Sequence, residues 1–133
     1  MTEDIWERFE AIEECYEFML AYAAQGLTSD KGNDSGRQIR EYLNRAVEAL
    51  DGLAESCPTP GDAFAAFLAV LDRDARDSLA GIRLVLAQPT ISSQLIDNLN
   101  ASMHLRALLT DVFLLGEVFR MQRATAQIAT SLT

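Results

Sequence analysis

The chain has 133 residues with 20 acidic and 11 basic side chains, so its formal net charge at pH 7 is −9. Apolar residues make up 49% of the sequence, which excludes a disordered acidic tail, and the length suits one domain with a buried core. The negative charge argues against partners that need a positive protein surface. We therefore expect the chain to bind neither nucleic acid nor an anionic membrane.

We expect neither a targeting segment nor a membrane-spanning segment in this chain. Its N-terminus lacks the basic residues and the apolar stretch of a signal peptide. The most apolar stretch, 105–119, contains three charged side chains and is shorter than the ~20 residues that a transmembrane helix needs. Cys15 and Cys57 have no metal-binding spacing and are expected to be reduced, buried residues. A cytoplasmic location is the expectation.

Glycine and proline positions divide the chain into four predicted helices, and no segment alternates apolar and polar residues as a strand does. The first helix is expected to end at Gly26, the second to begin with a capping box from Ser35 to Gln38, and the third to begin after Thr59 with Pro60 in its first turn. These signals predict an all-α fold with a single domain, 1–133. Its architecture is an antiparallel four-helix bundle with a long C-terminal helix, and the helices span about 2–25, 35–55, 60–88 and 92–131.

The last predicted helix is apolar on almost every side. Leucine, valine and phenylalanine residues between positions 108 and 119 cover nearly the whole circumference of its helical wheel. A helix of this kind has to be buried on every side, whereas each helix of a four-helix bundle keeps a face toward solvent. We therefore expect a homodimer, and its interface contains Leu108, Val112, Leu115 and Phe119. The alternative is a central last helix that the other three helices surround.

The first predicted helix carries a narrow acidic stripe, because its glutamates recur at spacings of three and four. The stripe, which we name the acidic ridge, contains Glu3, Glu7, Glu10, Glu14 and Glu17. One interpretation is a docking surface for a protein with a basic surface, with Trp6 at its edge as an aromatic anchor. The other is a face that only interacts with solvent, since exposed helix faces are commonly charged.

The lone histidine, His104, raises two possibilities for chemistry. Ferritin-like di-iron bundles use Glu-x-x-His motifs, but Ala101 stands three residues before His104, so no metal is expected. A small acidic helical bundle with one histidine also resembles histidine phosphotransfer domains. Those domains carry Leu, Lys and Gly at the second to fourth positions after the histidine, where this chain has 106–108, Arg-Ala-Leu. We expect His104 to be an ordinary helix residue that pairs with Asp111 on the same face.

No catalytic motif is apparent: the chain has neither a nucleophile elbow nor a phosphate-binding loop. The sequence therefore favours a small acidic helical bundle without catalytic residues or a cofactor, which acts by binding other proteins. It is similar in outline to the small acidic helical chaperones and adaptors of bacteria. The expected partners are a second copy of the chain and a protein with a basic surface. The alternative is a bundle that binds a metal or a small ligand between its helices.

Overall fold

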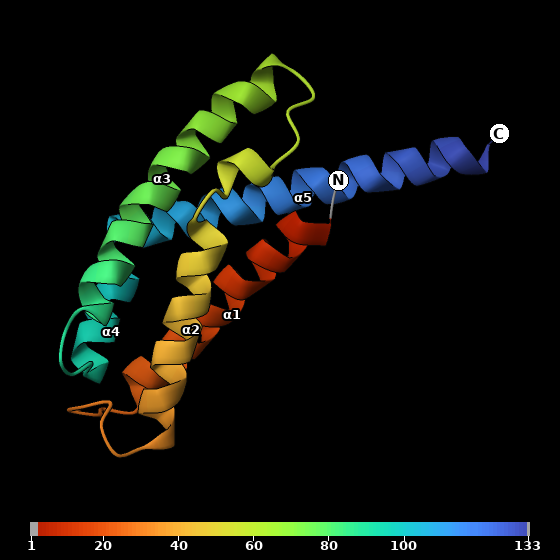
Figure 1. Cartoon of the computed structure of the whole chain (residues 1–133). Helices are drawn as coiled ribbons and strands as arrows, with labels where there is room; N and C mark the ends of the chain where they lie inside the picture. The colour runs from red at the N-terminus through yellow and green to blue at the C-terminus, as the bar shows by residue number, and fades with distance from the viewer. Residues whose placement is uncertain (1–2, 133) are drawn as a thin grey trace.

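The computed structural model describes residues 3–132, and this part of the chain is all-α, with five α-helices and no strand (Figure 1). The helices, with one short 3-10 helix (η1), are α1 (Glu3–Ala24), α2 (Asp34–Leu50), η1 (Ala54–Ser56), α3 (Asp62–Leu86), α4 (Ser93–Ala101) and α5 (Met103–Ser131). The main packing pairs are α1 with α2, α3 with α5, and α1 with α4.

Apolar side chains at helical spacing form the core between these pairs. On α1, Ile5, Phe9, Ile12 and Met19 lie three, four or seven residues apart and are buried. They face Ile39 and Leu43 of α2, α4 and part of α5 within one cluster of buried side chains. Gly26 ends α1 with a φ of 65°, a left-handed conformation that glycine adopts without strain, so this predicted boundary is confirmed.

Two predicted helix starts are wrong. The N-cap of α2 is Asn33 rather than Ser35, because the Asn33 side chain accepts a hydrogen bond from the backbone N–H of Gly36 at 2.6 Å. Helix α3 begins at Asp62 after the extended residue Gly61, so Thr59 and Pro60 lie outside it. The second helix also ends at Leu50, before the predicted residue 55, because Gly52 turns the chain with a φ of 73°.

The long helix predicted over 92–131 is interrupted at Ser102, which is a further correction. Ser102 has an extended backbone (ψ of 141°), and its hydroxyl accepts a hydrogen bond from the N–H of Leu105 at the start of α5. The backbone N–H of Ser102 donates to the carbonyl of Leu99, so this group keeps a hydrogen bond at the break. The break creates two helices, α4 and α5, that pack against different neighbours: α4 against α1, and α5 against α3.

Helix α5 runs beyond the rest of the molecule. Its first half packs against α3, with Phe119 stacked on Phe64 near the far end of that contact. Every residue from Met121 to Leu132 is exposed, and this segment extends past α1 toward the C-terminus (Figure 1). No helix within the described residues is long and apolar enough to cross a membrane.

Candidate functional site

The exposed part of α5 carries a row of mainly apolar side chains, which Thr125 interrupts. Of the nine large hydrophobic residues that are exposed in the described chain, six belong to α5 or to Leu132, its C-cap. Residues at spacings of 4, 3, 4, 3 and 4 lie within about 40° of one line along the helix, at 100° per residue. We name this row the α5 strip; it consists of Leu114, Val118, Met121, Thr125, Ile128 and Leu132. Its leucine, isoleucine and methionine side chains are between 51% and 81% exposed.

The residues predicted to form a dimer interface lie on the opposite side of α5. Leu108, Val112, Leu115 and Phe119 are all buried within this single chain, where they complete its core. They are therefore not accessible to a second copy in this conformation. The apolar surface that α5 leaves to solvent is the α5 strip together with Phe113, which is 51% exposed.

Only part of the acidic ridge of α1 is exposed and without an ion-pair partner. Glu7, Glu10 and Glu17 are exposed, whereas Glu14 accepts a 2.8 Å hydrogen bond from the Arg45 guanidinium of α2. The side chain of Glu3 lies outside the described residues. The ridge is thus an acidic surface whose middle is tied to the neighbouring helix.

Trp6, the expected aromatic anchor, is already engaged within the chain. Its ring packs edge-on against Phe9 and Phe119, and the guanidinium groups of Arg120 and Arg123 lie 5.6 and 5.2 Å from its centre. Stacked cations of this kind contribute about 0.5–1 kcal/mol each at exposed sites. Trp6 therefore fixes the base of the projecting α5 segment against α1 instead of extending into solvent.

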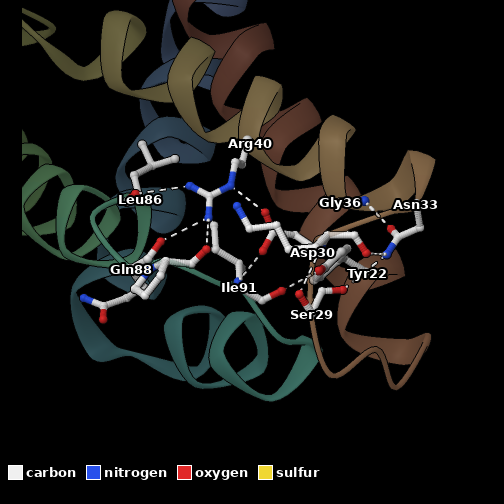
Figure 2. A network of polar contacts seen from close by, with 11 residues as sticks. Tyr22, Ser29, Asp30, Asn33, Gly36, Arg40, Leu86, Gln88 and Ile91 are labelled. Atoms are coloured by element: carbon white, nitrogen blue, oxygen red, sulfur yellow. Dashed lines mark hydrogen bonds and ion pairs between the residues drawn. The ribbon is translucent and has the colours of Figure 1, made fainter.

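Two arginines bind the C-terminal ends of helices, where backbone carbonyls lack partners. Arg8 of α1 donates to the carbonyls of Ala49 and Asp51 at the end of α2. Arg40 of α2 donates to the carbonyls of Leu86 and Gln88 at the end of α3, at 3.2 and 3.1 Å (Figure 2). Arg8 and Arg40 thus stabilise helix ends, a role that the sequence alone does not indicate.

Arg40 also forms an ion pair that joins two loops. Its Nε donates to Asp30 at 2.6 Å, and the Asp30 side chain is only 4% exposed. The other carboxylate oxygen of Asp30 accepts from the N–H of Ile91, in the loop between α3 and α4 (Figure 2). Although burial acts to raise it, the pKa of Asp30 is lowered by the Arg40 and backbone hydrogen bonds. We name this set, Asp30, Arg40 and the bonded backbone groups, the loop latch.

Tyr22 and Ser93 extend the loop latch toward α1. The Tyr22 hydroxyl donates to the carbonyl of Ile91 at 2.6 Å, and burial raises the pKa of this phenol. Ser93 donates to the carbonyl of Tyr22, while its oxygen accepts from the N–H of Leu27. The most densely connected polar groups of the molecule therefore hold loops together, which is a structural role.

A second polar cluster lies between α3 and α5. Asp111 of α5 is buried and faces Asp74 of α3; desolvation first, and then the neighbouring Asp74 carboxyl, raise the pKa of Asp111 to about 7. The expected pair of His104 with Asp111 is wrong: His104 Nδ1 lies 3.8 Å from Asp77 Oδ2 instead. Two helical turns, about 10 Å, separate positions 104 and 111 along α5, so each faces a different residue of α3.

Replacing Asp111 with asparagine is expected to stabilise the protein by about 1–3 kcal/mol at pH 8 and to change little at pH 4. The folded pKa of Asp111 lies above its ordinary value of 3.8, so the unfolded chain binds fewer protons between these values. Stability then falls as the pH rises from about 4 to about 7. Urea unfolding across this range measures the effect, with Asp97→Asn as the control because Asp97 is exposed. An unchanged stability at pH 8 would contradict the prediction.

A groove of about 460 Å³ lies where α1, α4 and α5 meet. Arg106 and Asp97 both line it, and neither side chain has an ion-pair or hydrogen-bond partner among the described residues. Tyr16 and Phe113 add aromatic surface. The groove is open to solvent and offers opposite charges to a small polar molecule.

The described residues contain no group of three or more histidine, cysteine, aspartate or glutamate side chains that could hold a metal ion. Cys15 and Cys57 are both buried and unpaired, and burial raises the pKa of their thiols to about 12 and about 11. Thiols with such pKa values are poorly reactive near pH 7. Comparison of the chain with protein-family models, with curated proteins and with solved structures finds no match.

Proposed function

We propose that this protein is a non-enzymatic helical bundle that acts by binding protein, and that the α5 strip is its main binding surface. The observation that supports the proposal is the exposure of this strip on a helix that extends past its own bundle (Figure 1). Contiguous exposed apolar surface is typical of interaction sites. A helix with such a row binds a partner helix or groove through positions three and four residues apart.

The energetics of the projecting segment support the same proposal. An isolated helix shorter than about 12–15 residues is marginal in water, and most helices are stabilised by packing of an apolar face. Residues 121–132 are exposed, and their contacts with the bundle concentrate at its base, through Arg123 and the aromatic ring of Trp6. A bound partner would supply the packing that the rest of the segment lacks.

The acidic ridge provides a second surface in this proposal. Glu7, Glu10 and Glu17 are exposed on one face of α1, where they favour a partner with a basic surface through long-range attraction. Attraction of this kind raises the association rate more than the affinity. The apolar α5 strip would then account for most of the binding free energy, because burial of apolar area dominates most protein association.

A photoreactive amino acid at Ile128 is expected to yield a covalent protein adduct in cells of the source organism, because this side chain is 61% exposed on the α5 strip. Gln127 is the matched control, since its neighbouring position points away from the strip at 100° per residue. Adducts at Ile128 but not at Gln127, measured by mass spectrometry, would support the proposal. Equal labelling at both positions, or none at either, would contradict it.

A small-ligand site is the second candidate function. The groove between α1, α4 and α5 favours it, because Arg106 and Asp97 present unpaired charges of opposite sign to one space. A small molecule that carries both a carboxylate and an ammonium group would match these charges. The groove is polar and open, however, whereas most ligand sites are largely apolar and enclosed. The α5 strip is therefore the stronger candidate.

A further inference from the structure

We propose that the carboxyl groups of Asp74 and Asp111 form a pH-sensitive contact between α3 and α5, which holds α5 in place while one carboxyl carries a proton and loosens when both are ionised. Asp111 lies in the part of α5 that packs against α3, and it is only 6% exposed. Its Oδ2 is buried, and no hydrogen-bond donor of the described residues reaches this atom. Such a contact acts on the fold itself, whichever partner the α5 strip binds.

The arrangement of the two carboxyl groups requires a proton. Asp74 of α3 and Asp111 are joined by a side-chain hydrogen bond. Ionised carboxylates have only acceptor oxygens, so a hydrogen bond between two carboxyl groups needs a proton on one of them. Asp111 is the more buried of the two, and burial disfavours its ionised form, so Asp111 donates and Asp74 accepts. Loss of this proton replaces the hydrogen bond with repulsion between two negative charges.

No basic side chain of the described residues compensates for that repulsion. Helices α1, α3 and α4 pack against α5, and Asp74 is the charged group on them that acts on Asp111. The other charged or titratable groups near these contacts have different neighbours: Asp77 lies beside His104, Asp97 shares the groove with Arg106, and Glu13 and Glu117 lie near Arg120. Ionised Asp111 is therefore left with Asp74 as its charged neighbour.

The break at Ser102 provides a pivot for α5. Because the backbone is extended at Ser102, α5 can tilt there without deforming α4. The Ser78 hydroxyl of α3 donates to the carbonyl of His104 at 2.9 Å, which holds the first turn of α5 against α3. Asp111 lies about 14 Å beyond Ser102 along the helix, and Phe119 lies about 26 Å beyond it. A tilt that separates Asp111 from Asp74 therefore displaces Phe119 about twice as far.

Trp6 reports the position of α5 at Phe119, and it is the only tryptophan in the sequence. Its ring packs edge-on against Phe119, and the guanidinium groups of Arg120 and Arg123 lie over it. A displacement of α5 changes the surroundings of the indole ring, and tryptophan fluorescence measures that change.

Fluorescence of the full chain, titrated from pH 5 to pH 9, is expected to show a transition with a midpoint at about pH 7. Burial first, and then the Asp74 carboxyl, raise the pKa of Asp111 to about 7. Asp111→Asn should remove the transition and keep the low-pH spectrum throughout, because asparagine is neutral and can donate to Asp74. Asp74→Asn should lower the midpoint by about one pH unit or more, because the like charge is gone.

Two variants exclude other sources of the signal. His104 is charged only when protonated, and the pKa of Glu13, near Arg120, is raised by burial, so both groups could contribute to a titration. His104→Gln and Glu13→Gln are each expected to retain the transition at about pH 7. Circular dichroism checks that each variant keeps its helices.

Hydrogen exchange tests whether α5 itself loosens. After correction for the intrinsic pH dependence of exchange, the amides of 108–119 are expected to lose protection between pH 6 and pH 8 in the wild type but not in Asp111→Asn. A wild type without the fluorescence transition or the loss of protection would overturn the inference. So would a transition that persists in Asp111→Asn, one that His104→Gln or Glu13→Gln removes, or an Asp111→Asn variant that fails to fold.

Discussion

Replacing Arg40 with methionine is expected to destabilise the fold by about 3–5 kcal/mol, the cost of leaving a buried charge without its partner. Methionine keeps the apolar part of the side chain but removes the guanidinium that bonds Asp30 and the carbonyls of Leu86 and Gln88. The Asp30 carboxylate, only 4% exposed, would keep its hydrogen bond from Ile91 but lose its counter-ion. Urea unfolding at pH 7 measures the change in the free energy of unfolding.

A matched control lies one turn away on the same helix. Arg37 forms an ion pair with Asp34, but these side chains are 67% and 85% exposed. Exposed pairs contribute about 0–1 kcal/mol, so Arg37→Met should have little effect. Equal effects of the two substitutions would show that the loop latch has no special importance for stability.

The partner substitution separates the charge from the hydrogen bonds. Asp30→Asn keeps an oxygen that can accept a hydrogen bond from the N–H of Ile91. It also removes the carboxylate charge that Arg40→Met leaves without a counter-ion. The double variant is therefore expected to be more stable than Arg40→Met alone, which a double-mutant cycle measures directly. In the wild type the pKa of Asp30 is lowered, so its contribution is present above the ordinary value of 3.8 and is lost as the pH falls below it.

Local signals predicted much of the fold because they depend on neighbouring residues. Gly26 ends α1 as expected, and the lack of alternating apolar and polar residues correctly predicts that the described residues form helices and no strand. The break at Ser102 was missed, although Asn98, Asn100 and Ser102 are residue types that favour helix ends. Apolar spacing on both sides of Ser102 was compatible with one continuous helix, and only the packing of α4 and α5 distinguishes the alternatives.

The candidate binding surface depends on contacts that sequence spacing does not contain. A helical wheel shows that α5 is apolar all round, but it does not show which face the other helices cover. In the structure the core takes Leu108 and Val112 and leaves Leu114 and Ile128 exposed. The loop latch was missed for the same reason, since Arg40 and Leu86 are 46 residues apart. Only Gly36, an unusual residue in the first turn of a helix, hinted at a close approach there.

Gly36→Ala is expected to destabilise the protein by about 3 kcal/mol, although alanine favours helix over glycine by about 1 kcal/mol. A Cβ at this position would overlap the backbone carbonyl of Asp30, which is held by the loop latch. Because the obstacle is backbone rather than a flexible side chain, relief requires the loop to move away from α2. That movement would lengthen the hydrogen bond from Arg40 to Asp30. The steric clash and the weakened loop latch therefore both lower the free energy of unfolding.

Gly81→Ala provides the opposite expectation within the same molecule. Gly81 lies inside α3, where a Cβ would make an ordinary contact at 3.6 Å with Leu99 Cδ1, so this substitution is expected to stabilise by up to about 1 kcal/mol. Both variants replace a helical glycine with alanine, and helix propensity alone predicts the same sign for both. Opposite shifts in the urea midpoint would show that the approach of Asp30 to α2 decides the result. A stabilised Gly36→Ala variant would mean that the loop adjusts freely and that the loop latch does not hold it.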